Sequence, residues 1–226
     1  VAGLNVPGVM GCASTYVRAG LGGVDGRALA AGTRLPLTDS NARVSELVIT
    51  QPPAADESPI RLVPGPQADH FSAAALEALV GSDYRVTAEA DRMGIRLEGA
   101  RLEHTAAAEI VSDATVPGSI QVPGAGQPIV LLADAQTAGG YPKIATVITA
   151  DLGRLAARSP GHSLRFATVT APEGAQIARA AEAETRALIA AIRPLPADGI
   201  DLVALYTGNL VDGVVHALGA EYRPLY

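Results

Sequence analysis

Residues Gly118–Ala145 read GSIQVPGAGQPIVLLADAQTAGGYPKIA, and the interpretation of the chain starts from this stretch. Its apolar run, Pro128–Ala133, predicts a buried strand that ends in polar and ionisable residues around a Gly139-Gly140 step. Adjacent glycines let a backbone adopt positive φ or approach a ligand closely. Polar groups on a loop held by a rigid strand commonly present a functional site, although a hairpin connection whose side chains face water would show the same pattern.

The loop after this strand concentrates five kinds of polar group within a short distance, carried by Asp134, Gln136, Thr137, Tyr141 and Lys143. Gln136 can donate and accept hydrogen bonds at once, and Lys143 can neutralise an anionic oxygen. Tyr141 can donate a proton or stack on a ligand. Asp134 is the nearest candidate base, and a structural role in tying the turn together is its favoured alternative. We predict Gln136, Tyr141, Lys143 and Asp134 as the catalytic group.

Composition narrows the class of protein. Hydrophobic residues make up 48% of the 226 residues and charged residues 18%, which supplies a packed core and argues against wholesale disorder. The 24 Gly and 16 Pro favour many turns and short strands. The net charge of −6 argues against a nucleic-acid partner. No apolar run approaches the roughly 18 residues that a membrane span needs.

Cysteine and histidine usage excludes two further kinds of site. Cys12 is the only cysteine, so no internal disulfide can form, which fits a reducing compartment and predicts a cytoplasmic location. The four histidines are scattered without the short spacings of metal ligands, so no metal site is predicted.

Hydrophobic patterning predicts a mainly β chain with minor α content. The strongest strands are expected at 120–122, 128–133 and 144–148, and helical spacing predicts one long helix over Pro172–Ile192. Many short apolar strands would leave exposed edges unless the sheet closes on itself. We therefore expect a closed or nearly closed β-barrel.

A polar and Pro-rich segment at 38–58 is the best candidate linker. We expect residues 1–50 to be the remainder of an N-terminal lobe and residues 51–226 to form a barrel domain that contains the long helix. The chain opens with an apolar segment that runs straight into a turn, so we expect the start of the lobe to be absent from this sequence. A hairpin is expected over 200–206 and 210–218.

Several motifs, in order along the chain, resemble the allophanate hydrolase subunit 2 family. This family includes the Kip antagonist proteins, the C subunit of prokaryotic 5-oxoprolinase and the carboxyltransferase region of urea amidolyase. The strongest motif is QTAGGYPKIATVI at 136–148, followed by Ala150-Asp151-Leu152. Further motifs lie at 14–16 with 18–20, 63–67, 91–94 with 96–99, and 116–118 with 121–123.

The resemblance implies a cyclophilin-like β-barrel that pairs with a B subunit of the same family type, and the A subunit is a further expected partner. It implies a component of an ATP-dependent amidohydrolase that opens 5-oxoproline to glutamate. The alternatives are the carboxyltransferase component of a biotin-dependent urea or amide carboxylase, and a non-catalytic regulator of a sensor kinase. No cofactor is expected on this chain itself. The complex would use ATP, and biotin would enter under the carboxyl-transfer alternative.

The distant motifs add candidate substrate-binding residues, which we expect to meet the loop at one concave pocket. Arg18 is a candidate anion contact. Asp91 and Arg92 could form a fixed ion pair at a turn, or a surface salt bridge of little energetic value. Gln121 would face either solvent or the barrel interior if it lies on a strand. The predicted substrate-binding set is Arg18, Asp91, Arg92, Gln121, Thr137, Gly139 and Gly140.

Two positions depart from the family pattern. The family often has Arg where this chain has Ala135, and a second Thr where it has Ala138. If that Arg holds an anionic substrate in relatives, this chain has to hold its substrate in another way.

Overall fold

The structure, a computed structural model, describes residues 3–38, 47–49 and 56–194. Among the described residues the chain divides into two compact units, the barrel unit, which ends at Ile192, and an N-terminal unit of residues 3–38 and 47–48 together with Arg193 and Pro194. The N-terminal unit contains the 3₁₀-helix η1 (Val17–Ala19) and an antiparallel pair of short strands, β1 (Leu47–Val48) and β12 (Arg193–Pro194).

Two expectations about organisation stay open. The boundary predicted near residue 50 remains a prediction. The hairpin predicted over 200–206 and 210–218 lies outside the described residues.

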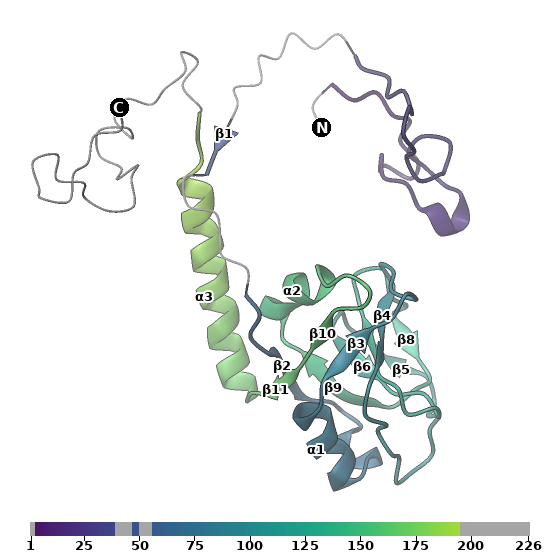
Figure 1. Ribbon diagram of the computed structural model, residues 1–226, viewed down its shortest axis with the longest axis vertical. Coiled ribbons are helices and arrows are strands. Elements are labelled where there is room, and N and C mark those ends of the chain that lie inside the picture. Colours follow the sequence, from purple (N-terminus) through teal and green to yellow (C-terminus); the bar gives the residue numbers. More distant parts are fainter. Residues whose placement is uncertain (1–2, 39–46, 50–55, 195–226) are drawn as a thin grey trace, which may run out of the picture. The chain divides into compact units, whose positions relative to one another are not determined.

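The barrel unit is built on one eight-stranded sheet (Figure 1). In spatial order its strands are β10 (Ser163–Leu164), β3 (Tyr84–Val86), β4 (Gly94–Glu98), β7 (Ile129–Leu131), β6 (Ser119–Gln121), β9 (Lys143–Val147), β2 (Ile60–Pro64) and β11 (Phe166–Thr168). Neighbouring strands run antiparallel, except that β11 is parallel to β2.

The two edge strands of this sheet are consecutive in the sequence, so the chain itself connects one edge to the other. Its outermost strands, β10 and β11, are separated in sequence by Arg165 alone. Arg165 is held by a bidentate ion pair in which its Nε and Nη2 donate to the Asp83 carboxylate at 2.5 and 3.0 Å. The sheet is therefore nearly closed, and the expected mainly β, barrel-like fold is confirmed.

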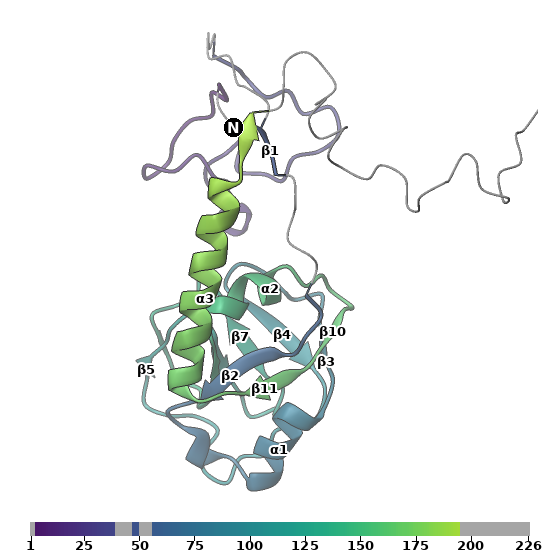
Figure 2. The ribbon, with the colours of Figure 1, turned by 90° about the vertical axis from the view of Figure 1, so that its left-hand side faces the viewer.

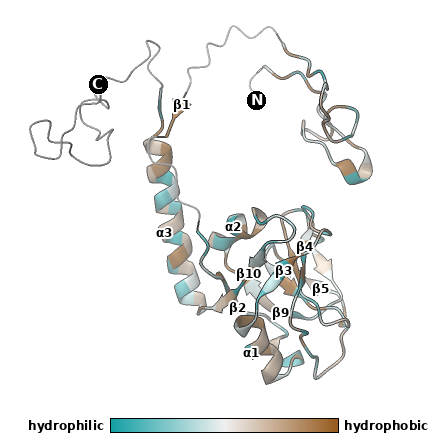
Figure 3. Ribbon diagram, in the orientation of Figure 1, coloured by the Kyte–Doolittle hydropathy of each residue, from teal (hydrophilic) through white to brown (hydrophobic). Residues whose placement is uncertain are grey.

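The barrel interior is filled by branched aliphatic side chains, as the scarcity of aromatic residues requires. Alternation along β4 places Ile95 and Leu97 inward and Arg96 outward. Tyr84 and Phe166 are an aromatic pair of this core, with ring centroids 5.7 Å apart. Burial raises the pKa of the Tyr84 phenol to about 12. In Figure 3 the apolar colour appears on barrel strands such as β4, and also on α1 and in patches along α3.

Short helices lie around the barrel. The helical segment over 68–81 is interrupted at Ser72, which adopts an extended conformation and whose hydroxyl caps the next helix by accepting from Ala75 N. The result is η2 (Ala68–His70) followed by α1 (Ala73–Gly81), which lies at one end of the barrel (Figure 2). The turn η3 (Thr149–Asp151) leads directly into α2 (Leu152–Ala156).

The long helix α3 (Ala171–Ala190) confirms the helix predicted over Pro172–Ile192. Thr170 and Glu173 form a capping box at its start. Gly174 is buried in this helix, and a Cβ there would lie 3.1 Å from Ile148 Cγ2. The missing side chain thus lets the first turns of the helix pack closely on the barrel.

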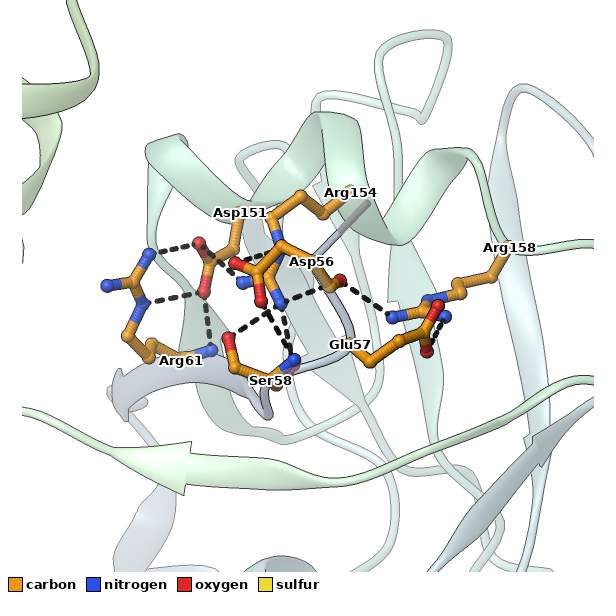
Figure 4. Close-up of polar contacts among 7 residues, drawn as sticks. All are labelled: Asp56, Glu57, Ser58, Arg61, Asp151, Arg154 and Arg158. Atoms are coloured by element: carbon orange, nitrogen blue, oxygen red, sulfur yellow. Dashed lines mark hydrogen bonds and ion pairs between the residues drawn. The ribbon is translucent and has the colours of Figure 1, made fainter. Parts of the chain in front are cut away.

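The fully buried carboxylate of Asp151 joins the first barrel strand to α2 (Figure 4). Its Oδ2 accepts hydrogen bonds from Arg61 N at 2.7 Å and Arg61 Nε at 2.9 Å, and its Oδ1 pairs with Arg61 Nη2 at 2.6 Å. Arg154 Nη1 lies 3.2 Å from the same Oδ1. Burial alone would raise the pKa of Asp151, but the hydrogen bonds and charges of Arg61 and Arg154 outweigh it and hold that pKa below its ordinary value.

The same network anchors the segment that enters the barrel unit. Arg154 Nη2 donates to Ser58 O at 2.6 Å, and Arg154 Nε lies 3.1 Å from Asp56 Oδ2. Arg158 Nη1 pairs with Glu57 Oε2 at 2.6 Å. Residues 56–58 are therefore fastened to α2 and the residues just after it through arginine side chains (Figure 4).

The substitution Asp151→Asn should lower the free energy of unfolding by about 2–4 kcal/mol, because it leaves two arginines without their buried counter-ion. Urea unfolding at neutral pH measures the loss. Glu98→Gln is the control, since Glu98 pairs with Arg85 on the exposed surface and its loss should cost no more than about 0.5 kcal/mol.

The pH dependence gives an independent check. A carboxyl whose folded-state pKa is lowered stabilises the fold above its unfolded pKa, and this contribution is lost as the pH falls through the folded pKa. Asp151→Asn should therefore unfold with a shallower loss of stability in acid than the parent chain. Equal acid slopes, or equal losses in Asp151→Asn and Glu98→Gln, would show that this network does not stabilise the barrel.

Candidate functional site

Lys143 is buried at the start of β9. It is the only lysine in the chain, and the other basic side chains are arginines and histidines. Its side chain is 2% exposed. The β6–β9 ladder pairs Lys143 with Gln121, next to a register irregularity between Ile120 and Gln121. Gln121 is also 2% exposed. Gln121 therefore does not face solvent; its strand neighbours Ile120 and Val122 belong to the core, and its own side chain is buried beside Gly139.

The Lys143 ammonium has a single ion-pair partner among the described residues. Lys143 Nζ lies 2.9 Å from Asp113 Oδ2, and Asp113 is 48% exposed. Gln67 Nε2 donates to the same oxygen at 3.0 Å, while Gln67 Oε1 accepts from Lys143 N at 3.1 Å. The Lys143 ammonium and then the Gln67 amide hold the pKa of Asp113 below its usual range. We call Gln67, Asp113, Gln121 and Lys143 the Lys143 cluster.

Gln121 contributes an unused donor to this cluster. Within the part of the chain that the structure describes, Gln121 Nε2 has no hydrogen-bond partner, and Lys143 Nζ has none beyond its ion pair. A buried amide without a partner is costly and marks a place that a ligand can satisfy. Gly139 lies directly against it, because a Cβ at this position would be 2.4 Å from Gln121 Nε2.

The predicted loop is one side of a two-stranded ribbon, formed by residues 110–115 and 136–140. Its centre is the antiparallel pair β5 (Asp113–Ala114) and β8 (Ala138–Gly139). Ile110 N donates to Gly140 O at 2.8 Å, and Thr115 N donates to Thr137 O at 3.0 Å. Thr115 Oγ1 donates to Gln136 O. The backbone of the loop is thus paired along its length, and the ribbon carries Asp113 to Lys143.

The remaining predicted catalytic residues lie around this ribbon. The side chains of Gln136 and Thr137 are exposed, and Tyr141 is 39% exposed at the end of the ribbon. Asp134 pairs with Arg92, with Arg92 Nε 2.8 Å from Asp134 Oδ2. Asp134 therefore has the turn-tying contact that was its structural alternative.

Of the candidate residues from distant motifs, some have structural contacts elsewhere and one pairs in register with Lys143. Asp91 Oδ1 accepts from Met93 N at 2.8 Å and from Gly94 N at 3.2 Å, so this carboxylate caps the turn before β4. The charge partner that the structure shows for Arg92 is Asp134, just beyond the neighbouring strand β7, where the sequence suggested Asp91. Arg18 belongs to the N-terminal unit, in η1. Gln121 is the distant candidate whose position on β6 pairs in register with Lys143 on β9.

Two members of the cluster were missed by sequence reasoning. Gln67 closes one of the motifs that carry the resemblance, and that is the signal which could have nominated it. Asp113 lies in a polar stretch without periodicity and had no such signal. Gly65 lies tightly against β9, because a Cβ at this position would be 2.2 Å from Lys143 O. The turn at 64–67 therefore needs glycine to bring Gln67 against β9.

Three cavities of the barrel unit are lined by other residues. One of about 300 Å³ includes Arg92, Pro117 and Leu152. One of about 510 Å³ lies between β9 and the first turns of α3, and one of about 700 Å³ is bordered by the Asp151 network. The concave pocket predicted around Gln136, Tyr141 and Lys143 stays a prediction, since Lys143 lies covered by the ribbon.

Neither a metal cluster nor a membrane-spanning helix occurs in the part of the chain that the structure describes. There, no three histidine, cysteine or acidic side chains are grouped closely enough to hold a metal ion. No helix in the described ranges combines the length and the apolar character that crossing a membrane requires.

Comparison with curated proteins finds two relatives, each named as the C subunit of 5-oxoprolinase. The protein from Escherichia coli K12 is 41% identical over 164 residues, which cover 73% of this chain and 53% of the relative. The protein from Haemophilus influenzae is 40% identical over 177 residues, which cover 78% of this chain and 57% of the relative. The chain thus spans a little over half the length of these relatives.

Solved structures give the same fold. Urea amidolyase of K. lactis superimposes with a TM-score of 0.67 at 21% identity, over 83% of this chain and 13% of that one, and this likeness shows the fold alone. The protein TTHA0988 superimposes with a TM-score of 0.57 at 37% identity, over 74% of this chain and 31% of that one.

The family described as carboxyltransferase domain, subdomain A and B, matches residues 1–168. The motifs from 14–16 through 150–152 lie within this range. The resemblance is therefore confirmed, and the chain belongs to the carboxyltransferase-domain family.

Proposed function

We propose that this chain is the C subunit of an ATP-dependent amidohydrolase that opens 5-oxoproline to glutamate together with the A and B subunits of the same complex. The observation that carries the proposal is the pair of buried donors, Gln121 Nε2 and Lys143 Nζ, on register-paired residues of neighbouring strands. The two relatives named as the C subunit of 5-oxoprolinase, at 41% and 40% identity, support it.

The chemistry of the substrate suits this pair of donors. 5-Oxoproline carries a lactam carbonyl and a carboxylate. Opening the lactam places negative charge on the carbonyl oxygen, and preoriented donors in a site without water stabilise that charge most strongly. The amide of Gln121 would donate to the carbonyl oxygen, and the ammonium of Lys143 would neutralise the carboxylate. Because both side chains are 2% exposed, little water competes for either contact.

The proposed roles of the other loop residues follow from their positions. Tyr141 and Gln136 lie at the surface of the ribbon, where they can contact the substrate or another chain of the complex. Asp134 is held by Arg92. It is therefore a weaker candidate base than the sequence suggested, and the proton transfers are assigned to Tyr141 or to a group on the A and B subunits.

Carboxyl transfer from carboxybiotin is the second candidate function. It is favoured by the description of the matching family as a carboxyltransferase domain. The same two donors could hold a carboxyl group during transfer. A regulatory role without catalysis would leave the buried donors unused.

Reconstitution distinguishes these functions. The full chain is combined with the A and B subunits, and ATP hydrolysis is measured with and without 5-oxoproline. Under the proposal, ATP hydrolysis depends on both 5-oxoproline and this chain. Carboxylation of an amide by a biotin carboxylase partner, without any response to 5-oxoproline, would favour the second function. No activity with either partner set would favour regulation.

The substitution Lys143→Met should lower the turnover of the reconstituted complex by at least about tenfold, because a charge-stabilising donor is lost. Stability should change little, since Asp113 is 48% exposed and returns to water when its partner is removed. Activity per folded molecule and the melting temperature are measured together. A large fall in melting temperature with activity intact would assign Lys143 a structural role.

The substitution Gly139→Ala should also lower turnover severalfold, because the new methyl group would press on Gln121 Nε2 and turn the amide away. Gly124→Ala is the matched control, since its nearest neighbour would be Ala108 Cβ at an ordinary 3.6 Å. Steady-state rates of the two variants give the comparison. Equal rates would mean that the orientation of Gln121 does not matter for the reaction.

A further inference from the structure

The ion pair between Lys143 and Asp113 is strongly asymmetric. The Lys143 side chain is 2% exposed, while that of Asp113 is 48% exposed. A buried ammonium needs a counter-ion at all times, because an isolated charge in a desolvated site costs several kcal/mol. A half-exposed carboxylate can move into water at small cost. If one partner of this pair leaves, it is Asp113, and another anion has to take its place.

Asp113 also lies on a short element outside the main sheet of the barrel unit. The β5–β8 pair is two residues long and is separate from the eight-stranded sheet. Short, surface-lying pairs of this kind open at low free energy compared with core strands. The side-chain contacts that hold the carboxylate inward are the Lys143 ion pair and the Gln67 hydrogen bond.

A second hydrogen-bond donor, the Gln121 amide, could bind an anion that replaces the Asp113 carboxylate. Gln121 Nε2 is buried and has no hydrogen-bond partner among the described residues, and its residue is register-paired with Lys143. Gly139, on the same ribbon as Asp113, lies against it. Movement of the ribbon would therefore open the ammonium and the free amide together.

We propose that the Asp113 carboxylate is an internal stand-in for the carboxylate of the substrate, which displaces it from Lys143 while a second oxygen of the substrate accepts from the Gln121 amide. The substrate class is a small molecule that bears a carboxylate and a neighbouring carbonyl. The exchange replaces one negative charge by another, so the buried ammonium keeps a counter-ion throughout. The inference rests on the proposed function only in naming 5-oxoproline as that molecule.

The lone lysine makes the exchange directly measurable. Because Lys143 supplies the only side-chain amine of this chain, acylation by the N-hydroxysuccinimide ester of acetic acid reports on it without interference from other lysines of the same chain. The full chain, in complex with the A and B subunits, is acylated for increasing times, and the peptide containing Lys143 is quantified by mass spectrometry. The ligand concentration that halves the rate is determined for 5-oxoproline and for 2-pyrrolidinone, which is the same lactam without the carboxylate.

The expected results separate a stand-in from a fixed structural pair. In the parent chain, 5-oxoproline should protect Lys143 and 2-pyrrolidinone should not. In Asp113→Asn, whose folding is checked by its melting temperature, 5-oxoproline should protect at concentrations at least about 5–10-fold lower, because the competing carboxylate is gone and the buried ammonium then lacks a counter-ion. Glu98→Gln removes the same charge three strands away, on β4, and should leave the protecting concentration unchanged.

Other results overturn the inference and can be told apart from failure of the proposed function. Equal protection by both lactams, or unchanged or weaker protection in Asp113→Asn, means that Asp113 is a fixed structural partner, whatever the 5-oxoproline-dependent ATP hydrolysis shows. If 5-oxoproline does not protect, acetate, malonate and glutamate are tested in the same way. Protection by one of these with the Asp113→Asn shift supports the stand-in and rejects 5-oxoproline as substrate. No protection by any carboxylate rejects the stand-in.

Discussion

The barrel unit depends on one buried carboxylate. Asp151 satisfies the backbone and the side chain of Arg61 on β2 and meets Arg154 on α2. Because a buried charge must be paired, this single residue fixes β2 against α2, two segments that are distant in sequence. The strand β9 runs between β2 and β6, so the place of Lys143 follows from the same anchor. The motif Ala150-Asp151-Leu152 thus has a structural role in this chain, because its carboxylate secures β2 against α2.

Two buried charges with opposite behaviour coexist in this unit. Asp151 is held by arginine groups whose own partners tie down the entering segment, and nothing in that arrangement can leave cheaply. Lys143 is held by a carboxylate that is half in water and sits on a short ribbon. Both satisfy the requirement that a buried charge be paired, but only the second leaves the partner replaceable. Under the proposed function, this difference distinguishes the structural ion pairs of Asp151 from the proposed binding site at Lys143.

Much of the fold could be predicted because its signals are local. Apolar runs at 120–122, 128–133 and 144–148 became β6, β7 and β9, and the periodicity after Pro172 became α3. The ribbon could not be predicted in this way. Residues 110–115 show no hydrophobic alternation, and their pairing with 136–140 depends on contacts that form only after the barrel exists. For the same reason Asp113 had no signal, and Lys143 was placed on a loop although the structure buries it on β9.

The place where the barrel closes, between β10 and β11, has a consequence for biosynthesis. The strands that close the sheet, β10 and β11, are its last two in the chain, and they lie on either side of Arg165. During vectorial synthesis the other six strands are made first, so they can only form an open sheet with two unpaired edges. Unpaired edges invite pairing with other chains. The nascent protein is therefore most exposed to aggregation just before residues 163–168 leave the ribosome, and a translational pause at that point would favour misassembly over closure.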